Sequence, residues 1–529
     1  MTLSIAGLRI TPVYTAPQAA ASNAASSSAT QQTAAIPSTS SSVSLGQTTR
    51  NEDASTYSAR GALLASAQRY ALQDDTTDKL SIAMLSGVQA TSNNARFQGV
   101  GAALLEQLVV KGGQSVSQSV FGYAGDVQPG AEALKLRADS LRQDPTNAIT
   151  LSLTTTSGAT VRLSLVADEQ GLAVSAEVQD GELDANQLKG LASLADSFQS
   201  AIDGLTREPP QLKLGELVKP DPALFSSLKL DANLRTASGE QQAFALDISA
   251  SARSLSLNGP TGNLELNLDT RDASLLGNAS QRQAAVRNYL DQFDAAQARG
   301  KGDKELMGLF KDAFVQLNSA DDDRASPTGG KVLGGNDRVL LSGLADFTAK
   351  VGKAEQSVNP LLPAETDRFD YEVSQSTKVN GTALSTRSVQ QDQQSRLSAA
   401  WHEGLNPLVP LALGTDFKSQ NYRYHEIDDR ASSSTRLAWN KDNKLVEASA
   451  SQQASQSERV RTYVDGVLSD DVSTPRSTAQ SRNLLGLIDG AFQRERTSLR
   501  ERGVSILESQ LASKRDSWSL QADPSEIRG

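Results

Sequence analysis

The sequence predicts an α+β protein in which antiparallel β-meanders are each followed by packing helices, behind a disordered N-terminal tail. Three observations predict it. Apolar residues alternate with a period of two in three separate blocks of the chain. Each block is followed by apolar residues spaced three and four apart, which is the helical pattern. The first 50 residues are rich in Ser and Ala and contain no acidic residue, a composition typical of disorder.

Composition limits the class of protein. The 529 residues suffice for two to four domains. Their hydrophobic share of 38% is low beside the roughly 45–50% of globular chains, so thin cores are expected. The absence of cysteine excludes disulfides, thiolate metal sites and cysteine nucleophiles. The 51 basic and 61 acidic residues are mixed along the chain, which disfavours nucleic acid as a partner. No apolar run approaches the roughly 18 residues of a transmembrane helix.

Residues 1–52 form the predicted disordered tail. Arg9 and Pro12 interrupt its only apolar run, so it is no cleavable signal peptide. Its Ser-rich, acid-poor composition resembles the N-termini of substrates of type III secretion and flagellar export systems. We therefore expect a protein that is either cytoplasmic or exported without a cleavable signal.

Residues 53–147 form a predicted helical region. Its three candidate helices lie near 62–72, at 98–123 and at 131–143, and a glycine pair, Gly112-Gly113, can interrupt the second. Residues 148–207 then change to a strand pattern. A three-strand meander begins at Ile149 and precedes a helix that Asp184 caps.

A second β block occupies residues 208–318. Alternating apolar residues predict strands between 228 and 268, and two helices follow them. Residues 319–367 read as a linker that contains a short helix over 337–351. Whether these units arose by duplication stays open.

The third block, residues 368–475, predicts a long polar antiparallel sheet, followed by a C-terminal helix over 476–515 and a tail over 516–529. Ser, Gln and Thr are so frequent at 374–396 and 447–459 that neither face is continuously apolar. Such strands specify their register weakly and leave edges exposed. We therefore expect surface or edge recognition here rather than catalysis.

This block holds both histidines of the chain, His402 and His425. His425 and Glu426 begin a zincin-like motif, but no second histidine follows at helical spacing, which disfavours a metalloprotease. His402 is expected in an irregular segment between strands, where a tryptophan anchors the loop. The candidate surface consists of Trp401, His402, Glu403, Tyr422, Tyr424, His425 and Glu426.

Two functions remain open. The first is a non-catalytic bacterial interaction or structural protein with protein partners and no cofactor. Its Ala/Ser/Thr/Gln-rich, aromatic-poor composition resembles flagellar axial and hook-related proteins, which implies association with the motility or envelope apparatus. The alternative is an enzyme or metal-binding domain in which His402 and His425 approach one another. The sequence does not decide the oligomeric state.

Overall fold

The computed structural model describes residues 69–74, 76–123, 127–319, 333–381 and 386–527. These residues form one antiparallel sheet of 15 strands with helices packed on it, which confirms the predicted α+β class. The predicted tail over 1–52 and most of the helix expected near 62–72 lie outside the described residues. The described end of that helix is instead strand β1 (Arg69–Leu72), which pairs with β2. Within the described ranges, no helix is long and apolar enough to cross a membrane.

The strand order is β1-β2-β5-β4-β3-β6, and from there the strands follow chain order to β15. The first group is β1 (Arg69–Leu72), β2 (Val116–Tyr123), β3 (Asn147–Thr155), β4 (Thr160–Ala167) and β5 (Gly171–Gln179). The second is β6 (Phe225–Arg235), β7 (Gln241–Ser249), β8 (Ala252–Gly259), β9 (Gly262–Asp269) and β10 (Asp346–Ser357). The third is β11 (Thr366–Asn380), β12 (Ser388–Gly404), β13 (Tyr422–Trp439), β14 (Leu445–Val464) and β15 (Val467–Asn483).

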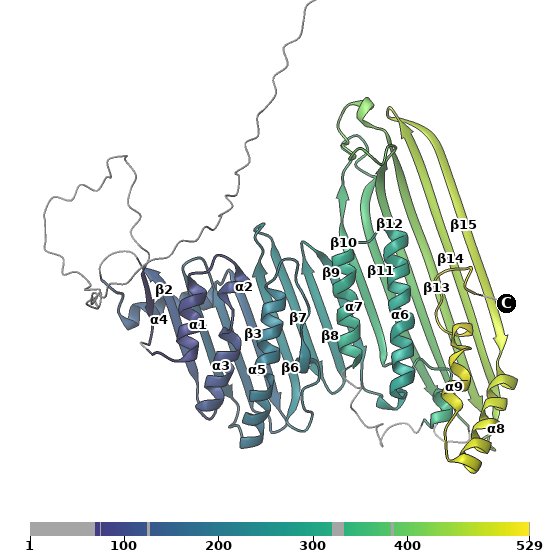
Figure 1. Cartoon of the computed structure of the whole chain (residues 1–529), viewed down its shortest axis with the longest axis horizontal. Coiled ribbons are helices and arrows are strands. Elements are labelled where there is room, and N and C mark those ends of the chain that lie inside the picture. The colour runs from purple at the N-terminus through teal and green to yellow at the C-terminus, as the bar shows by residue number, and fades with distance from the viewer. Residues whose placement is uncertain (1–68, 75, 124–126, 320–332, 382–385, 528–529) are drawn as a thin grey trace, which may run out of the picture. The chain divides into compact units, whose positions relative to one another are not determined.

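The helices lie mainly on one face of this sheet (Figure 1). They are α1 (Lys79–Val88), α2 (Asn93–Arg96), α3 (Val100–Val110), α4 (Ala131–Gln143), α5 (Ala185–Leu205), α6 (Ala279–Gly300), α7 (Lys304–Ser319), α8 (Leu485–Arg502) and α9 (Leu507–Ala512). The exception is α4, which packs on the opposite face through Leu134 and Leu141 against Phe121. The neighbouring Val120 belongs to the main core, and consecutive strand residues face opposite sides.

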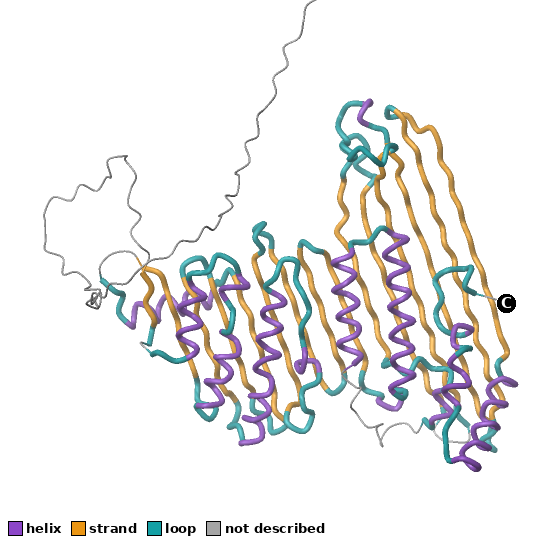
Figure 2. The backbone as a smooth tube through the Cα atoms, viewed as in Figure 1, coloured by secondary structure: helices purple, strands orange, loops and turns teal. Residues whose placement is uncertain are grey.

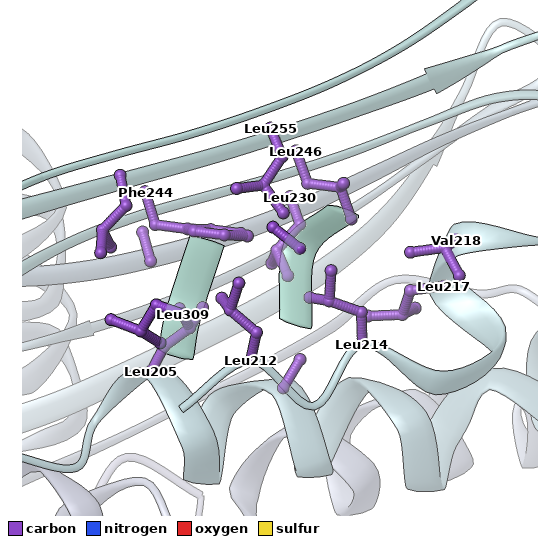
Figure 3. Close-up of a cluster of buried hydrophobic side chains, with 14 of the residues drawn as sticks. Leu205, Leu212, Leu214, Leu217, Val218, Leu230, Phe244, Leu246, Leu255 and Leu309 are labelled. Atoms are coloured by element: carbon purple, nitrogen blue, oxygen red, sulfur yellow. The ribbon is translucent and has the colours of Figure 1, made fainter. Parts of the chain in front are cut away.

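The main core lies between the sheet and the larger helix layer. Figure 3 shows part of it, where Leu230, Phe244 and Leu246 of the strands meet Leu205 and Leu309 of the helices. Each fully buried side chain of this size contributes about 1.5–3 kcal/mol to folding. The leucines that alternate along the sequence of these strands therefore form the inner face of the sheet.

The predicted meanders are confirmed. Ile149, Leu151 and Leu153 of β3 lie opposite Leu165, Leu163 and Val161 of β4, all buried on one face. The helix expected after them is α5, and the side chain of Asp184 caps it in a reciprocal capping box with Gln187.

Two helices expected from spacing are wrong. The helix predicted over 98–123 ends at Val110, because Gly112 and Gly113 adopt positive φ and release the chain into β2. The helix predicted over 337–351 is a 3-10 turn, Gly335–Arg338, followed by β10. Phe347, Ala349 and Val351 face the core opposite leucines of β9, so β10 joins the second block to the third in one sheet.

The C-terminal helix predicted over 476–515 is corrected as well. Strand β15 continues to Asn483 beside β14, and the helical part divides into α8 and α9. Gly503 at φ +65° ends α8. The segment 516–527 beyond α9, expected as a tail, packs against the sheet, and Trp518 and Leu520 are buried there.

Candidate functional site

The strands of the third block extend past the helix layer. Strand β13 has 18 residues and α6 has 22, which correspond to about 60 Å of strand and about 33 Å of helix. One end of strands β11–β15 therefore extends beyond the α-helices, and a 3-10 turn, Phe417–Ser419, lies there (Figures 1 and 2). Two loops and the turn between β14 and β15 close this end. With the strand residues beside that turn, we call them the distal loops: residues 358–365, 405–421 and 464–468.

All seven residues of the predicted surface lie near the distal loops, but not as one group. Trp401, His402 and Glu403 belong to β12 rather than to an irregular segment, because the strand stays paired with β13 as far as Gly404. Trp401 lies opposite His425 and His402 lies opposite Tyr424. Residues opposite each other in an antiparallel pair share a face, and faces alternate along a strand. The two histidines consequently lie on opposite faces of the sheet.

On the helix-side face, His425 belongs to a charged surface group. Its ring stacks on that of Trp401, with centroids 4.7 Å apart and planes 3° from parallel. Its Nδ1 lies 3.3 Å from Glu458 Oε1 and its Nε2 lies 3.1 Å from Glu403 Oε2. Arg299 of α6 reaches the same Glu458 at 3.7 Å. The group ties the end of α6 to the sheet.

On the opposite face, Glu365 is the centre of a buried polar cluster. One carboxylate oxygen accepts a hydrogen bond from Tyr463 (2.8 Å) and forms an ion pair with Arg461 Nη1 (3.0 Å), and the other accepts a hydrogen bond from Tyr422 (2.7 Å). Burial alone would raise the pKa of Glu365, but interactions with His402 and the two tyrosines, together with the Arg461 charge, hold the pKa below its usual value. Glu365 is therefore an anion at neutral pH.

His402 lies beside Glu365 with its side chain 1% exposed. Its Nδ1 is 2.6 Å from Asp367 Oδ1, and its Nε2 is 3.5 Å from Glu365 Oε2. Within the described part of the chain, Nε2 has no hydrogen-bond partner of good geometry. Burial lowers the pKa of His402, but hydrogen bonding and charge from Asp367 and Glu365 outweigh burial and raise the pKa above 6.5.

The cluster fixes the distal loops. Asn359, fully buried, donates from Nδ2 to Tyr422 Oη (2.9 Å) and to Gln420 Oε1 (2.8 Å). Gln420 in turn donates to the carbonyl of Gly414 (2.7 Å), and its own main-chain carbonyl accepts from the N–H of Gly466 (3.1 Å). Residues from all three loops are thus joined through one hydrogen-bond network, which restricts their motion.

Large apolar side chains stand exposed on these fixed loops. Leu408 is 89% exposed, Phe417 65% and Val467 67%. Phe417 lies against Gly466, where any side chain would clash with its ring. Further exposed apolar residues of the distal loops are Leu361, Leu362, Val409, Val464 and Leu468.

Neither of the two acid–base groups in the buried cluster is accessible from solvent. Both oxygens of Glu365 are engaged and His402 is covered, so neither group is open to a substrate. Glu426 pairs with Arg461 (3.0 Å). Among the described residues, no group of three or more His, Asp or Glu side chains is placed to hold a metal ion.

The sequence reading missed the central residues of the cluster. Glu365 and Asp367 lie at the start of the first strand of the block, and Arg461 and Tyr463 lie at the end of its fourth. No local pattern links these positions, which are up to 98 residues apart. The available signal was the repeated tyrosine at strand ends, Tyr422 and Tyr463, since a buried tyrosine hydroxyl needs a partner.

Comparisons of the chain with protein-family models, with curated proteins and with solved structures found no match.

Proposed function

We propose that the protein is a non-catalytic interaction protein that binds a protein partner through its distal loops. The observation that carries this proposal is the group of exposed apolar side chains led by Leu408, Phe417 and Val467. Several exposed apolar side chains that gather on loops at one end of a molecule are typical of interaction sites. Single exposed leucines elsewhere need no such explanation.

The buried cluster supports binding because it holds the loops before a partner arrives. A loop that is already ordered loses less conformational entropy on association. Pro407 and Pro410 flank Leu408 and Val409, and proline restricts φ on both sides of this pair. The apolar pair is therefore presented in a restricted conformation.

The charges of the loops favour a protein over an anionic membrane. Their exposed charged residues are Asp416, Lys418 and Asp465, which give no basic excess. Attraction to anionic lipid needs a cluster of Lys and Arg near the surface. A protein with an apolar groove fits the loops better.

For the setting of this partner, we propose the bacterial motility or envelope apparatus, since the composition of the chain resembles flagellar axial and hook-related proteins. Deletion of residues 2–50 tests the export part of the proposal. Export predicts that the deleted chain stays in the cell fraction while the full chain reaches the medium. An unchanged distribution would remove export from the proposal.

The binding proposal is tested by affinity capture with the intact chain and two matched variants. Leu408→Glu places a charge in the apolar surface, and Leu136→Glu places the same charge at an exposed leucine of α4, 71% exposed. We expect Leu408→Glu to lose the partner that wild type and Leu136→Glu both capture. Equal capture by all three proteins would refute the role of the distal loops.

A further inference from the structure

The segment 516–527, which we call the C-terminal strap, lies on the helix-side face of β12–β14 (Figure 2). A 3-10 turn, Arg515–Ser517, lies at its start, and the described residues after this turn belong to no helix or strand. Trp518, Leu520 and Ile527 are its buried apolar side chains. The strap occupies a position where the first two blocks of the sheet carry a helix.

Side chains of the sheet bind the main chain of the strap. Gln452 Nε2 donates to the carbonyls of Asp516 (2.8 Å) and Ser519 (2.6 Å). Ser433 Oγ donates to the carbonyl of Trp518 (2.6 Å). Three further bonds join Gln393 Oε1 to the N–H of Leu520 (3.0 Å), Gln456 Nε2 to the carbonyl of Ala522 (3.2 Å), and Gln292 Oε1 of α6 to the N–H of Ala522 (2.8 Å).

The surface beneath the strap is polar. Its floor is made of Gln393, Ser433, Gln452 and Gln456, whereas leucines lie beneath the helices of the first two blocks. Amide and hydroxyl groups that lose the strap regain hydrogen bonds to water, so uncovering them costs far less than uncovering leucine. The apolar cost of releasing the strap is therefore confined to Trp518 and to Leu520 and Ile527, which belong to the main core and which an identical strap would replace.

Packing beneath the strap is also incomplete. A cavity of about 260 Å³ is bounded by Tyr289 of α6, by Gln391 and Gln393 of β12, and by Trp518 and Ser519 of the strap. Contacts absent from one side of a side chain weaken its attachment. The strap is thus held both by hydrogen bonds to its main chain and by its buried apolar side chains, Trp518, Leu520 and Ile527.

We propose that the groove beneath the strap is a peptide site that binds extended main chain, and that its second occupant is the C-terminal strap of another copy of this protein. Bonds to the main chain are insensitive to side-chain identity, so specificity comes from Trp518 and Leu520. An identical strap presents both at the correct spacing. Reciprocal exchange of a terminal segment is a low-cost route to a dimer.

The absence of native cysteine makes a direct test simple. Gln456→Cys and Ala522→Cys are made in separate full-length chains, at positions joined by a hydrogen bond. Mixing the two chains with a short bis-maleimide cross-linker, which spans the length of the replaced glutamine side chain, should yield a covalent heterodimer, because the strap of one chain then lies in the groove of the other. Gln453→Cys, exposed on the opposite face of the same strand, is the control partner for Ala522→Cys.

A heterodimer with Gln456→Cys and none above background with Gln453→Cys supports the proposal. Equal yields from both pairs, or no product at any protein concentration, overturn it. Gln452→Ala, which removes two main-chain bonds to the strap, should change the rate of heterodimer formation at least tenfold. The matched variant Gln453→Ala should leave that rate unchanged.

A second measurement uses a labelled peptide of residues 513–527 and the full-length chain. Trp518→Ala in the chain weakens the strap in cis, so the wild-type peptide should bind this variant at least tenfold more tightly than it binds the wild-type chain. A peptide that carries the same Trp518→Ala change should bind neither. A folded Trp518→Ala chain, verified by circular dichroism, that fails to bind the wild-type peptide would refute the proposal.

Discussion

Replacement of Glu365 by glutamine should loosen the distal loops while the rest of the sheet stays folded. The carboxylate accepts hydrogen bonds from Tyr422 and Tyr463 and forms an ion pair with Arg461. Bonds to a charged group contribute about 1.5–3 kcal/mol each and neutral ones about 1 kcal/mol. The glutamine side chain keeps the shape but leaves only neutral bonds and removes the charge opposite Arg461. The expected loss is therefore about 3 kcal/mol.

Hydrogen exchange measures this loss locally. A change of about 3 kcal/mol lowers amide protection in residues 405–421 about a hundredfold, with little effect on the buried strands β3 and β6. Glu403→Gln is the control, since this exposed carboxylate pairs only at the surface, where an ion pair contributes about 0–1 kcal/mol. Protection in 405–421 that is equal in wild type and Glu365→Gln would refute the role assigned to the cluster.

The same measurement depends on pH with a defined sign. The pKa of Glu365 is lowered in the folded chain, so the stability that its carboxylate gives the distal loops is fully present above the unfolded pKa, about 4.5. That contribution is lost as the pH falls through the lower, folded value. Wild-type protection in residues 405–421, corrected for intrinsic exchange rates, should therefore fall on acidification, and the Glu365→Gln chain should lack this step.

Three further predictions follow from other contacts. The pKa of His402 is raised in the folded chain, so the stability that this residue gives the distal loops is complete below about pH 6.5 and is lost as the pH rises through the folded pKa. His402→Gln should abolish this alkaline loss of amide protection in the distal loops. Gly466→Ala should lower the free energy of opening of these loops by at least about 1–2 kcal/mol, because Gly466 has φ +76° and the added methyl would clash with Phe417. Unchanged hydrogen exchange in the distal loops would contradict this packing. Asp337→Ala should lower the free energy of unfolding, measured by urea denaturation, by about 3–5 kcal/mol. The substitution leaves the largely covered Arg387 without the carboxylate that its guanidinium contacts at 2.6 and 2.9 Å. A loss below about 1 kcal/mol would show that this ion pair is dispensable.

Local sequence pattern was enough wherever one face of an element is continuously apolar. The alternating leucines of β3, β4 and β6–β9 and the stripe of α7 identify elements whose partner is always the same core. The capping aspartate of α5 likewise acts within its own first turn. Among the elements that local pattern missed are β1, β2 and β10, whose apolar residues also fit a helical spacing. Their pairing with distant strands decided the outcome.

The candidate site shows the same division. The sequence alone determined that residues 422–429 form a strand whose successive side chains face opposite sides. Only the tertiary structure decided that His402 and His425 lie on different faces, because the pairing of β12 with β13 sets which residues are opposite. It also brought Glu365 to Tyr463, 98 residues away. Periodicity reports what one element buries, whereas strand register depends on contacts between elements, and those contacts are not encoded in any single stretch of the chain.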